Sequence, residues 1–483
     1  MHAFLSAPRE RRDLLLLQRR PATDASRQLR GDYGAFNDLA LRVRRASDLF
    51  LIIGPPGTGK TSFGMLTTLK EELAEEDGAV LLLSYTNRAV DEICSKLVAD
   101  DIDFIRIGKE LSCAPEYRSH LLSAVSRECP DAASLKRRLT ATRVYAATTA
   151  SMNGSLNLFQ LRQFSLAIVD EASQILEPQL IGLLSATAGG QSAIRKVVMI
   201  GDHKQLPAVV QQRAEESRVS EPILRDILLT DCRLSLFERL LRRYRDDADV
   251  VYMLHRQGRM HHHIALFPNE AFYNGLLDEV PRPHQRQPLA RKGNSTDGIE
   301  NLLQTRRVAF IHTDGPELPL SEKVNPIEAD LIAALVVHIY RREQAAFLSD
   351  TTVGVIVPYR NQIAAVRDTI ARSGIDALQD ITIDTVERFQ GSQRRYIIYG
   401  LTVQQPYQLD FLTENTFEDT DGTVVDRKLN VAMTRAEEHL LFVGNATLLA
   451  RDPVYRRLIE FLRTHNDYFD IPPDRFVNGE FQV

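Results

Sequence analysis

The sequence lacks the features that would place its 483 residues in a membrane or in a disulfide-stabilised fold. Its four cysteines include no Cys-x-x-Cys pair, which argues against a zinc ribbon and a disulfide framework, so we expect reduced thiols in an intracellular protein. The only apolar run near the start, Leu14–Leu17, is too short for a signal peptide or a membrane span. We therefore predict a cytoplasmic, nucleoid or nuclear location and no membrane partner.

The sequence also lacks an excess of basic charge. It holds 59 Lys and Arg residues against 64 Asp and Glu residues, which gives a formal net charge of -5 and a pI near 6.2. Without a global basic field, any nucleic-acid binding must use a local groove. The hydrophobic content of 44% is ordinary for a globular protein, and the length predicts at least two domains.

Short apolar runs recur along the chain, each followed by a turn and a helical pattern. They lie at 49–53, 80–84, 166–169 and 197–200, and then at 250–253, 308–311, 353–357, 396–403 and 440–444. This alternation is typical of βα units on a parallel sheet that is buried on both faces. We predict an α/β fold with two tandem domains, 1–248 and 249–465, and a C-terminal tail, 466–483.

Two further segments carry local signals without a chemical role. Residues 281–307 are rich in Pro, Gly and Arg and have weak periodicity, so we expect a long surface excursion. Asn325 is the predicted N-cap of a helix with Pro326 at its first position and Glu328 completing a capping box. We expect this helix to be structural only.

The stretch GPPGTGKT follows the apolar run 49–53 and precedes a helical pattern. Its glycines allow backbone N–H groups to wrap a phosphate at a helix N-terminus, Lys60 can reach the β and γ phosphates, and Thr61 can ligate Mg²⁺. The predicted nucleotide-binding residues of this loop are Gly54, Pro55, Pro56, Gly57, Thr58, Gly59, Lys60 and Thr61. This stretch predicts that the chain binds a nucleoside triphosphate with Mg²⁺.

Two adjacent carboxylates, Asp170 and Glu171, end the apolar run 166–169, at the strand edge where open α/β sheets bind ligands. Asp170 is suited to hold Mg²⁺, and Glu171 to orient and deprotonate the attacking water. A third run precedes GDHKQLP, where the neutral amide of Gln205 can sense a γ phosphate by hydrogen bonding.

The order of these motifs resembles that of the superfamily 1 helicases, because DEASQ followed by GDHKQLPAV is uncommon outside that group. The resemblance covers about residues 34 to 450 and implies two RecA-like domains with parallel sheets and a nucleotide cleft between them. The nearest branch is the 5′-to-3′ one, which includes the RNA helicase of nonsense-mediated decay and the flap-trimming replication nuclease-helicase.

The resemblance assigns further roles. Arg259 and Arg435 would be arginine fingers on the γ phosphate, because a planar, permanently charged guanidinium stabilises phosphoryl transfer. The implied nucleic-acid contacts are Thr86, Asn87, Thr148, Pro358, Tyr359, Arg360 and Thr385. The stretch SYTNRAVDE is more similar to DNA-acting members than to RNA-acting ones.

Three positions depart from the family pattern, and all three concern base or sugar recognition. Asn37 stands where the branch usually has a glutamine that reads adenine, and Gly258 stands where an aromatic stacks on the base. Gln393 replaces a more common glutamate near the ribose and phosphates. Triphosphate hydrolysis is thus better supported than a strict preference for ATP.

The resemblance also leads us to expect a truncated or naturally minimal helicase core, because about 50 residues precede the P-loop, too few for the β-barrel and stalks that family members carry there. A short family insertion would fall at about 105–143. There Arg137, Arg138 and Arg143 are either backbone contacts for nucleic acid or part of a solvated helix face.

The stretch LHRQGRMHHHIALFPN holds four histidines, which suggests a metal site. If RMHHHIALF is helical, as apolar Met260, Ile264 and Phe267 indicate, His261, His262 and His263 point in three directions and cannot converge on one ion. We instead expect Arg259 to be the functional residue of this stretch.

These observations predict a helicase or translocase that couples ATP hydrolysis to 5′-to-3′ movement on single-stranded or partly duplex nucleic acid, DNA rather than RNA. The alternative is a nucleotide-gated clamp or adaptor ATPase that binds strands without unwinding them. A nuclease within the chain has little support, since the acidic pairs lack an accompanying lysine arrangement; any nuclease or accessory domain would be supplied separately.

Overall fold

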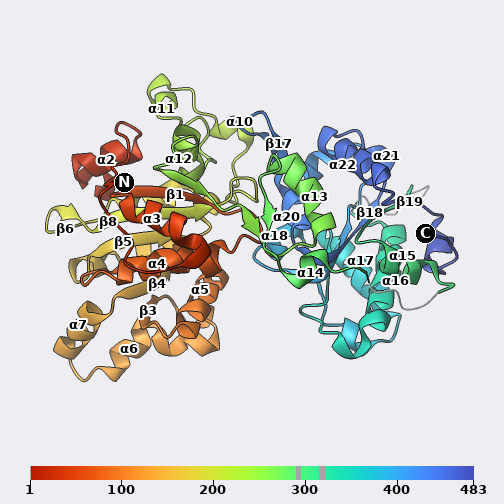
Figure 1. The fold of residues 1–483 in the computed structure, drawn as a ribbon, viewed down its shortest axis with the longest axis horizontal. Helices are drawn as coiled ribbons and strands as arrows, with labels where there is room; N and C mark the ends of the chain where they lie inside the picture. Colours follow the sequence, from red (N-terminus) through yellow and green to blue (C-terminus); the bar gives the residue numbers. More distant parts are fainter. Residues whose placement is uncertain (1, 290–294, 315–322) are drawn as a thin grey trace. The chain divides into compact units, whose positions relative to one another are not determined.

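The computed structural model describes residues 2–289, 295–314 and 323–483 (Figure 1). Internal contacts divide the chain into two units. The first comprises Met1–Pro55, Gly59–His203 and Pro207–Leu254, and the second comprises Pro56–Thr58, Lys204–Leu206 and His255–Val483. Among the residues that the structure describes, no helix is both long enough and apolar enough to span a bilayer.

The first unit is built around a seven-stranded parallel sheet. Its strands are β1 (Leu49–Ile53), β2 (Val80–Ser84), β3 (Phe104–Ile107), β4 (Val144–Thr148), β5 (Phe164–Val169), β8 (Ile194–Gly201) and β9 (Val251–Met253). They lie in the order β3-β4-β2-β5-β8-β1-β9, so β8 lies between β1 and β5. A short antiparallel pair, β6 (Thr187–Ala188) and β7 (Gln191–Ser192), stands apart from it.

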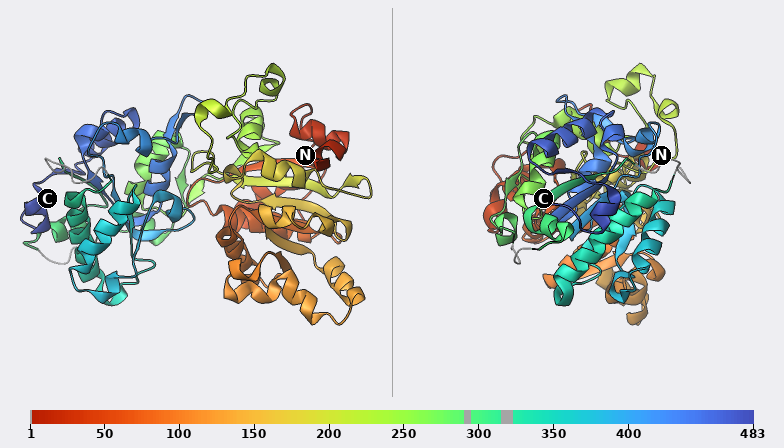
Figure 2. Two further views of the ribbon diagram at one scale, coloured as in Figure 1. Left: turned by 180° about the vertical axis from the view of Figure 1, so that it is seen from behind. Right: turned by 90° about the vertical axis from the view of Figure 1, so that its right-hand side faces the viewer.

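Both faces of this sheet are buried, as the unbroken apolar runs predict. Leu49, Leu51 and Ile53 of β1 face one core, and Phe50 and Ile52 face the other. Helices lie on both sides of the sheet (Figure 2). The helices of the unit are α1 (His2–Ser6), α2 (Arg9–Leu15), α3 (Asn37–Arg45), α4 (Leu66–Leu73), α5 (Asn87–Ala99), α6 (Leu122–Glu128), α7 (Ala132–Ala141), α8 (Thr149–Asn153), α9 (Glu177–Leu184), α10 (Ala214–Ser217), α11 (Pro222–Asp226) and α12 (Leu236–Tyr244).

The first sheet differs from the sequence-based expectation at two places. The run 250–253, expected to begin the second domain, is edge strand β9 of the first sheet, where Leu51 pairs with Val251. Strands β3 and β4 were not predicted, because β3 contains a charged residue and β4 is rich in alanine. A short apolar run shows that a strand forms but not which sheet it joins, since the partner is chosen by tertiary packing.

The second unit contains a six-stranded parallel sheet. Its strands are β12 (Val308–His312), β13 (Val353–Ile356), β14 (Thr382–Asp384), β15 (Arg394–Gly400), β18 (Ala436–Gly444) and β19 (Tyr468–Asp470), in the order β14-β13-β15-β18-β12-β19. The smaller pairs are β10 (Arg256–Gln257) with β11 (Asp278–Glu279) and β16 (Thr416–Glu418) with β17 (Val424–Asp426). The segment expected to be a C-terminal tail therefore supplies edge strand β19.

The helices of the second unit include one that we did not expect. They are α13 (His262–Phe272), α14 (Pro283–Arg286), α15 (Gly298–Thr305), α16 (Pro326–Glu343), α17 (Arg360–Ala371), α18 (Val386–Phe389), α19 (Gln408–Leu412), α20 (Arg427–Met433), α21 (Ala446–Leu449), α22 (Pro453–Thr464) and α23 (Pro473–Val477). Helix α15 lies in the predicted surface excursion, yet Ile299, Leu302 and Leu303 are buried in the core. Within that excursion, residues 290–294 lie outside the described residues.

The start of α16 is capped by Asn325, as predicted, but the capping box is not formed as expected. The Asn325 side chain accepts hydrogen bonds from the backbone N–H groups of Ile327 and Glu328. The Glu328 carboxylate, in contrast, accepts the backbone N–H of Thr402, at 2.9 Å, and not that of Asn325. Glu328 thus links α16 to the segment that follows β15.

Candidate functional site

The P-loop follows β1 and enters a helical segment, as predicted. Gly57 and Gly59 have φ values of 75° and 74°, a region that favours glycine. A Cβ atom added at Gly54 would lie 2.7 Å from Cβ of Lys60, so the loop is too tightly wound for a side chain there. Lys60–Met65 forms a π-helical turn that continues into α4. This arrangement leaves backbone N–H groups at a helix start, where an anion binds.

The last two residues of the P-loop, Lys60 and Thr61, meet the predicted acidic pair, Asp170 and Glu171. The Thr61 hydroxyl donates to Oδ2 of Asp170 at 2.7 Å. The two residues follow β1 and β5, which lie on either side of β8. Lys60 Nζ lies 2.6 Å from Oε1 of Glu171. Gln174 Nε2 donates to Oε2 of Glu171 at 2.8 Å, which orients that carboxylate. The sequence-based prediction grouped these residues, and the fold brings them together within the first unit.

Burial and charge set the ionisation of this cluster. Asp170 is 2% exposed, and burial, followed by the neighbouring Glu171 carboxylate, raises the pKa of Asp170 to about 6. Burial would lower the pKa of Lys60, but the carboxylates of Glu171 and Asp170 outweigh it, and the pKa is raised. Lys60 is therefore a charged ammonium at neutral pH.

Glu171 has a left-handed backbone, with φ of 53°, and its N–H donates to its neighbour Asp170 at 2.9 Å. A non-glycine residue in this region carries strain, which is common at functional sites. The hydroxyl of Thr61 and the carboxylate of Asp170 are hard oxygen ligands of the kind Mg²⁺ prefers, and Lys60 complements a phosphate. The residues present therefore fit a magnesium-bound triphosphate.

In the second unit, the two predicted fingers have different surroundings. Arg259 Nε donates to Oε1 of Gln393 at 2.8 Å, and Arg259 Nη1 donates to the Thr434 carbonyl at 3.1 Å. Arg435 is buried, and its Nε donates to the Val431 carbonyl at 3.1 Å. Gln205, which groups with this unit, accepts from Arg435 Nη2 at 3.1 Å. Four of the predicted catalytic and nucleotide-binding residues thus form two hydrogen-bonded pairs.

Only the later part of the histidine stretch is helical, because α13 begins at His262, three residues after the expected start at Arg259. His261 is its N-cap and accepts the His263 N–H, while His262 Nδ1 lies 2.5 Å from Oε1 of Glu279. Burial, together with the charge of Arg307, lowers the pKa of His261 to about 4. In the described ranges, no group of three or more His, Cys, Asp and Glu side chains is arranged to hold a metal ion.

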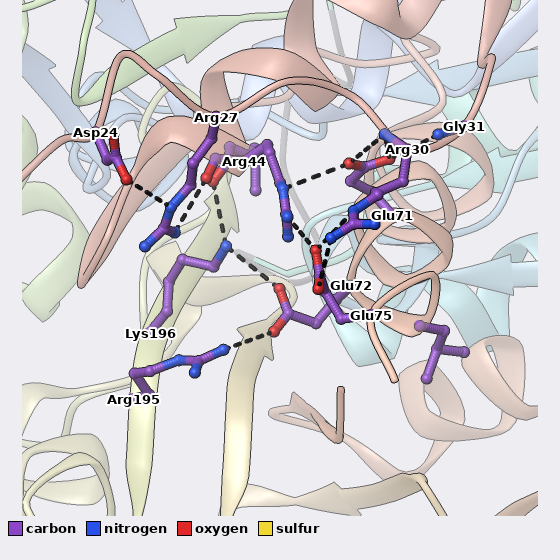
Figure 3. Close-up of polar contacts among 12 residues, drawn as sticks. Asp24, Arg27, Arg30, Gly31, Arg44, Glu71, Glu72, Glu75, Arg195 and Lys196 are labelled. Atoms are coloured by element: carbon purple, nitrogen blue, oxygen red, sulfur yellow. Dashed lines mark hydrogen bonds and ion pairs between the residues drawn. The ribbon is translucent and has the colours of Figure 1, made fainter. Parts of the chain in front are cut away.

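Asn37 is the first residue of α3, and its amide is bonded to the turn before it. Oδ1 accepts the Tyr33 backbone N–H at 2.7 Å, and Nδ2 donates to Oδ1 of Asp32 at 2.9 Å. The turn itself is held by the buried carboxylate of Glu71, which accepts the backbone N–H groups of Arg30 and Gly31 (Figure 3).

Predicted nucleic-acid contacts of the first unit gather at the carboxyl ends of neighbouring strands. Thr86 caps α5 after β2, and Thr148, the last residue of β4, caps α8. Because β2 and β4 pair with Ser84 opposite Thr148, both caps and Asn87 lie at one sheet edge. That edge is the one at which open parallel sheets bind ligands.

The second unit repeats this pattern and adds a residue that we did not predict. Tyr359 precedes α17 after β13, Thr385 precedes α18 after β14, and these two strands pair. The Tyr359 ring stacks on Phe411, with centroids 5.1 Å apart and planes at 18°. Phe411 is 41% exposed, and Lys428 Nζ lies 4.2 Å from its ring centroid. The sequence signal that could have identified Phe411 is its position as an aromatic residue in the segment that follows the apolar strand β15.

Arg138 and Arg143 both have partners within the first unit, a role that neither alternative, strand contacts or a solvated helix face, included. Arg138 forms a two-bond ion pair with Asp103 at 2.7 Å. Arg143 donates to the carbonyls of Gly78 and Leu73, just beyond and at the end of α4. Arg137 lies beside Arg138 on α7.

Known proteins resemble the chain over most of its length. Two family models, each described as an AAA domain, match residues 232–447 and residues 37–142 with 134–213. The DNA replication ATP-dependent helicase/nuclease DNA2 of Xenopus laevis is 30% identical over 454 residues, 89% of this chain and 39% of that protein. The human DNA2 is 28% identical over 468 residues, 91% of this chain and 40% of that protein.

One further curated relative and one solved structure are also similar to this chain. The DNA replication ATP-dependent helicase/nuclease JHS1 of Arabidopsis thaliana is 28% identical over 90% of this chain and 30% of that protein. In a solved complex of Arterivirus nonstructural protein 10 (helicase) with DNA, the similarity covers 85% of this chain and 62% of that one, at 14% identity and a TM-score of 0.39. The chain spans 30% to 40% of the length of the curated relatives described above.

Proposed function

Because the chain belongs to the superfamily 1 helicases, we propose that it is an ATP-dependent DNA helicase that couples triphosphate hydrolysis to 5′-to-3′ movement on a single strand. The observation that carries this proposal is the joined cluster of Lys60, Thr61, Asp170 and Glu171 beside the P-loop. The relatives' printed names support DNA as the substrate. A nuclease activity, which those names also give, would be supplied by a separate partner or domain.

Lys60 neutralises the β and γ phosphates, and an incoming phosphate replaces Glu171 as its counter-ion. Glu171, once released from Lys60, orients the attacking water and accepts its proton. Thr61 and Asp170 would hold Mg²⁺, which would supply charge neutralisation at the phosphates. Gln174 keeps the Glu171 carboxylate in place throughout.

Arg259 and Arg435 stabilise the negative charge that develops on the transferred phosphoryl group. Gln393 supports this role by fixing the Arg259 guanidinium through its amide oxygen. Gln205 is the neutral sensor of the γ phosphate and is bonded to Arg435. Because hydrolysis removes the γ phosphate, the contacts of the two arginines and of Gln205 with it would both be lost.

A DNA strand would follow the sheet edges that carry Thr86, Asn87 and Thr148 in the first unit and Pro358, Tyr359, Arg360 and Thr385 in the second. Caps and loops at strand ends offer hydroxyl and backbone groups for phosphates. The Tyr359–Phe411 stack, in which Phe411 is exposed, offers a surface for bases.

The test measures strand displacement from duplexes that carry a 5′ or a 3′ overhang, in DNA and in RNA. We expect displacement from the 5′-overhang DNA, with strand-stimulated phosphate release. Lys60→Ala should abolish nucleotide binding, whereas Glu171→Gln should retain it and lose at least about 10²-fold in turnover. Wild-type turnover in either variant would contradict the assigned roles.

The same assay separates the proposal from its alternative, a nucleotide-gated clamp. A clamp would show strand-stimulated hydrolysis and no displaced strand from any overhang. The side-chain amide of Asn37 is hydrogen-bonded within its own turn. This position bears on recognition of the nucleotide base and not of the DNA strand, so it favours neither the helicase nor the clamp.

A further inference from the structure

The amide of Asn37 is committed to its own turn. Oδ1 accepts the Tyr33 N–H at 2.7 Å and Nδ2 donates to Asp32 at 2.9 Å. If the amide rotated towards a nucleobase, the Tyr33 N–H and the Asp32 carboxylate would both lose this partner, at a cost for each. Asparagine is also one methylene shorter than the glutamine that the family usually has here. Asn37 is therefore poorly suited to read the edge of a base.

The turn that holds Asn37 is fastened to the P-loop helix. Glu71 of α4 accepts the backbone N–H groups of Arg30 and Gly31 at 3.0 and 3.2 Å, and the Tyr33 hydroxyl at 2.9 Å. Figure 3 shows this carboxylate within a network of charged side chains that also includes Arg44. Since α4 continues directly from Lys60–Met65, the position of the turn is tied to that of the P-loop.

An aromatic pair lies beside both features. Phe36 precedes Asn37, and Phe63 lies one helical turn after Lys60. Their rings are stacked, with centroids 5.2 Å apart and planes at 9°. A Cβ atom added at Gly59 would lie 2.5 Å from Phe63 Cδ2, so this ring touches the P-loop. Phe63 is nevertheless 45% exposed.

We propose that the exposed ring of Phe63, backed by Phe36, is the platform on which the base of the bound nucleoside triphosphate stacks. Stacking uses the π face that every base has, so this platform accepts purines and pyrimidines alike. This inference rests on the proposed function, because it takes the P-loop as the triphosphate site. It assigns the chain to nucleoside triphosphates as a class and not to ATP alone.

The first experiment compares hydrolysis of ATP, GTP, CTP and UTP by the whole chain in the presence of DNA. We expect kcat/KM values that differ by less than about tenfold, whereas a site that reads the base through hydrogen bonds discriminates by about 10⁴ or more. Discrimination at that level in favour of ATP would overturn the proposal.

The second experiment uses Phe63→Ala, with Phe63→Tyr as the matched control that keeps a ring. Phe63→Ala should raise KM for all four nucleotides by about tenfold with kcat unchanged, and Phe63→Tyr should keep wild-type values. Inorganic tripolyphosphate, which has no base, should inhibit the wild type and Phe63→Ala equally. An unchanged KM in Phe63→Ala would show that the ring does not bind the base. The same conclusion would follow if Phe63→Ala weakened inhibition by tripolyphosphate as much as it weakened nucleotide binding.

Direct binding keeps this inference separate from the proposed function. If the wild type hydrolyses none of the four nucleotides, the proposed function fails, and calorimetric titration with the same nucleotides still tests the platform. Binding of all four, weakened by Phe63→Ala, supports it, and binding of ATP alone overturns it. Because Phe63 is exposed, Phe63→Ala should melt at the wild-type temperature, which excludes loss of folding as the cause.

Discussion

At the scale of single residues, the chemistry depends on groups whose partners come from distant parts of the chain. Thr61 and Asp170 stand 109 positions apart and share a hydrogen bond, and Arg259 is bonded to Gln393 over 134 positions. Motif order predicted each of these residues, because P-loops and strand-end carboxylates have recognisable sequence contexts. The bonded state of Asn37 was not predictable, since an amide's partners depend on the conformation of the preceding turn.

Arg259 gives the prediction at this scale. Arg259→Ala should lower kcat for nucleotide hydrolysis by about 10³-fold, because an arginine finger stabilises charge that appears only in the transition state. Nucleotide affinity should change little, and single-turnover hydrolysis with separate binding measurements would show the difference. Arg256→Ala, at an exposed position on β10, is the control and should keep wild-type turnover. A fall in kcat in both variants would assign the effect to the fold of this segment.

At the scale of elements, α16 begins where predicted, but one of its side chains bonds to a distant segment that the local pattern does not indicate. The Asn325 cap of α16 was predicted from a local motif, because capping needs only residues near the helix start. Glu328 matched the capping-box spacing and yet bonds to Thr402, 74 positions away. Burial raises the pKa of Glu328 to about 8, so the carboxyl is largely protonated in the folded protein at neutral pH.

Glu328 makes stability depend on pH. Its pKa is higher in the folded state than in the unfolded state, so its favourable contribution is fully present below about pH 4.5 and is lost as the pH rises through about 8. Glu328→Gln, which is neutral at every pH, should reduce the fall in melting temperature between pH 5 and pH 8. The exposed Glu418→Gln is the control and should melt with the wild-type profile. Identical profiles for all three proteins would contradict this assignment.

At the scale of the whole molecule, the acidic balance of charge leaves strand binding to local features. With a net charge of -5, long-range attraction to a phosphate backbone is weak, and binding must come from strand-end caps and stacking surfaces. Lys428 lies over the Phe411 ring, but its ammonium is buried and paired with Glu414 at 2.6 Å, so this surface offers an aromatic ring and not a positive charge. Composition could exclude a global basic field but could not locate this surface.

Phe411 supplies the corresponding prediction. Phe411→Ala should weaken single-stranded DNA binding by about 1 to 3 kcal/mol, the range for loss of one stacked base, and should leave DNA-free nucleotide hydrolysis unchanged. Fluorescence anisotropy with a labelled oligonucleotide measures the affinity. Phe411→Tyr preserves the stack on Tyr359 and should bind like the wild type. Unchanged affinity in Phe411→Ala would remove this surface from the strand path.

The sequence by itself determined the α/β class, most strands of the two large parallel sheets, the P-loop and the acidic pair, because each of these depends on residues close together in the chain. Only the tertiary structure decided that 250–253 joins the first sheet, that Glu328 bonds to Thr402, and that Phe36 stacks on Phe63. The physical reason is the same in all three cases. Strand pairing, buried hydrogen bonds and ring stacking are completed by a partner that local sequence does not specify.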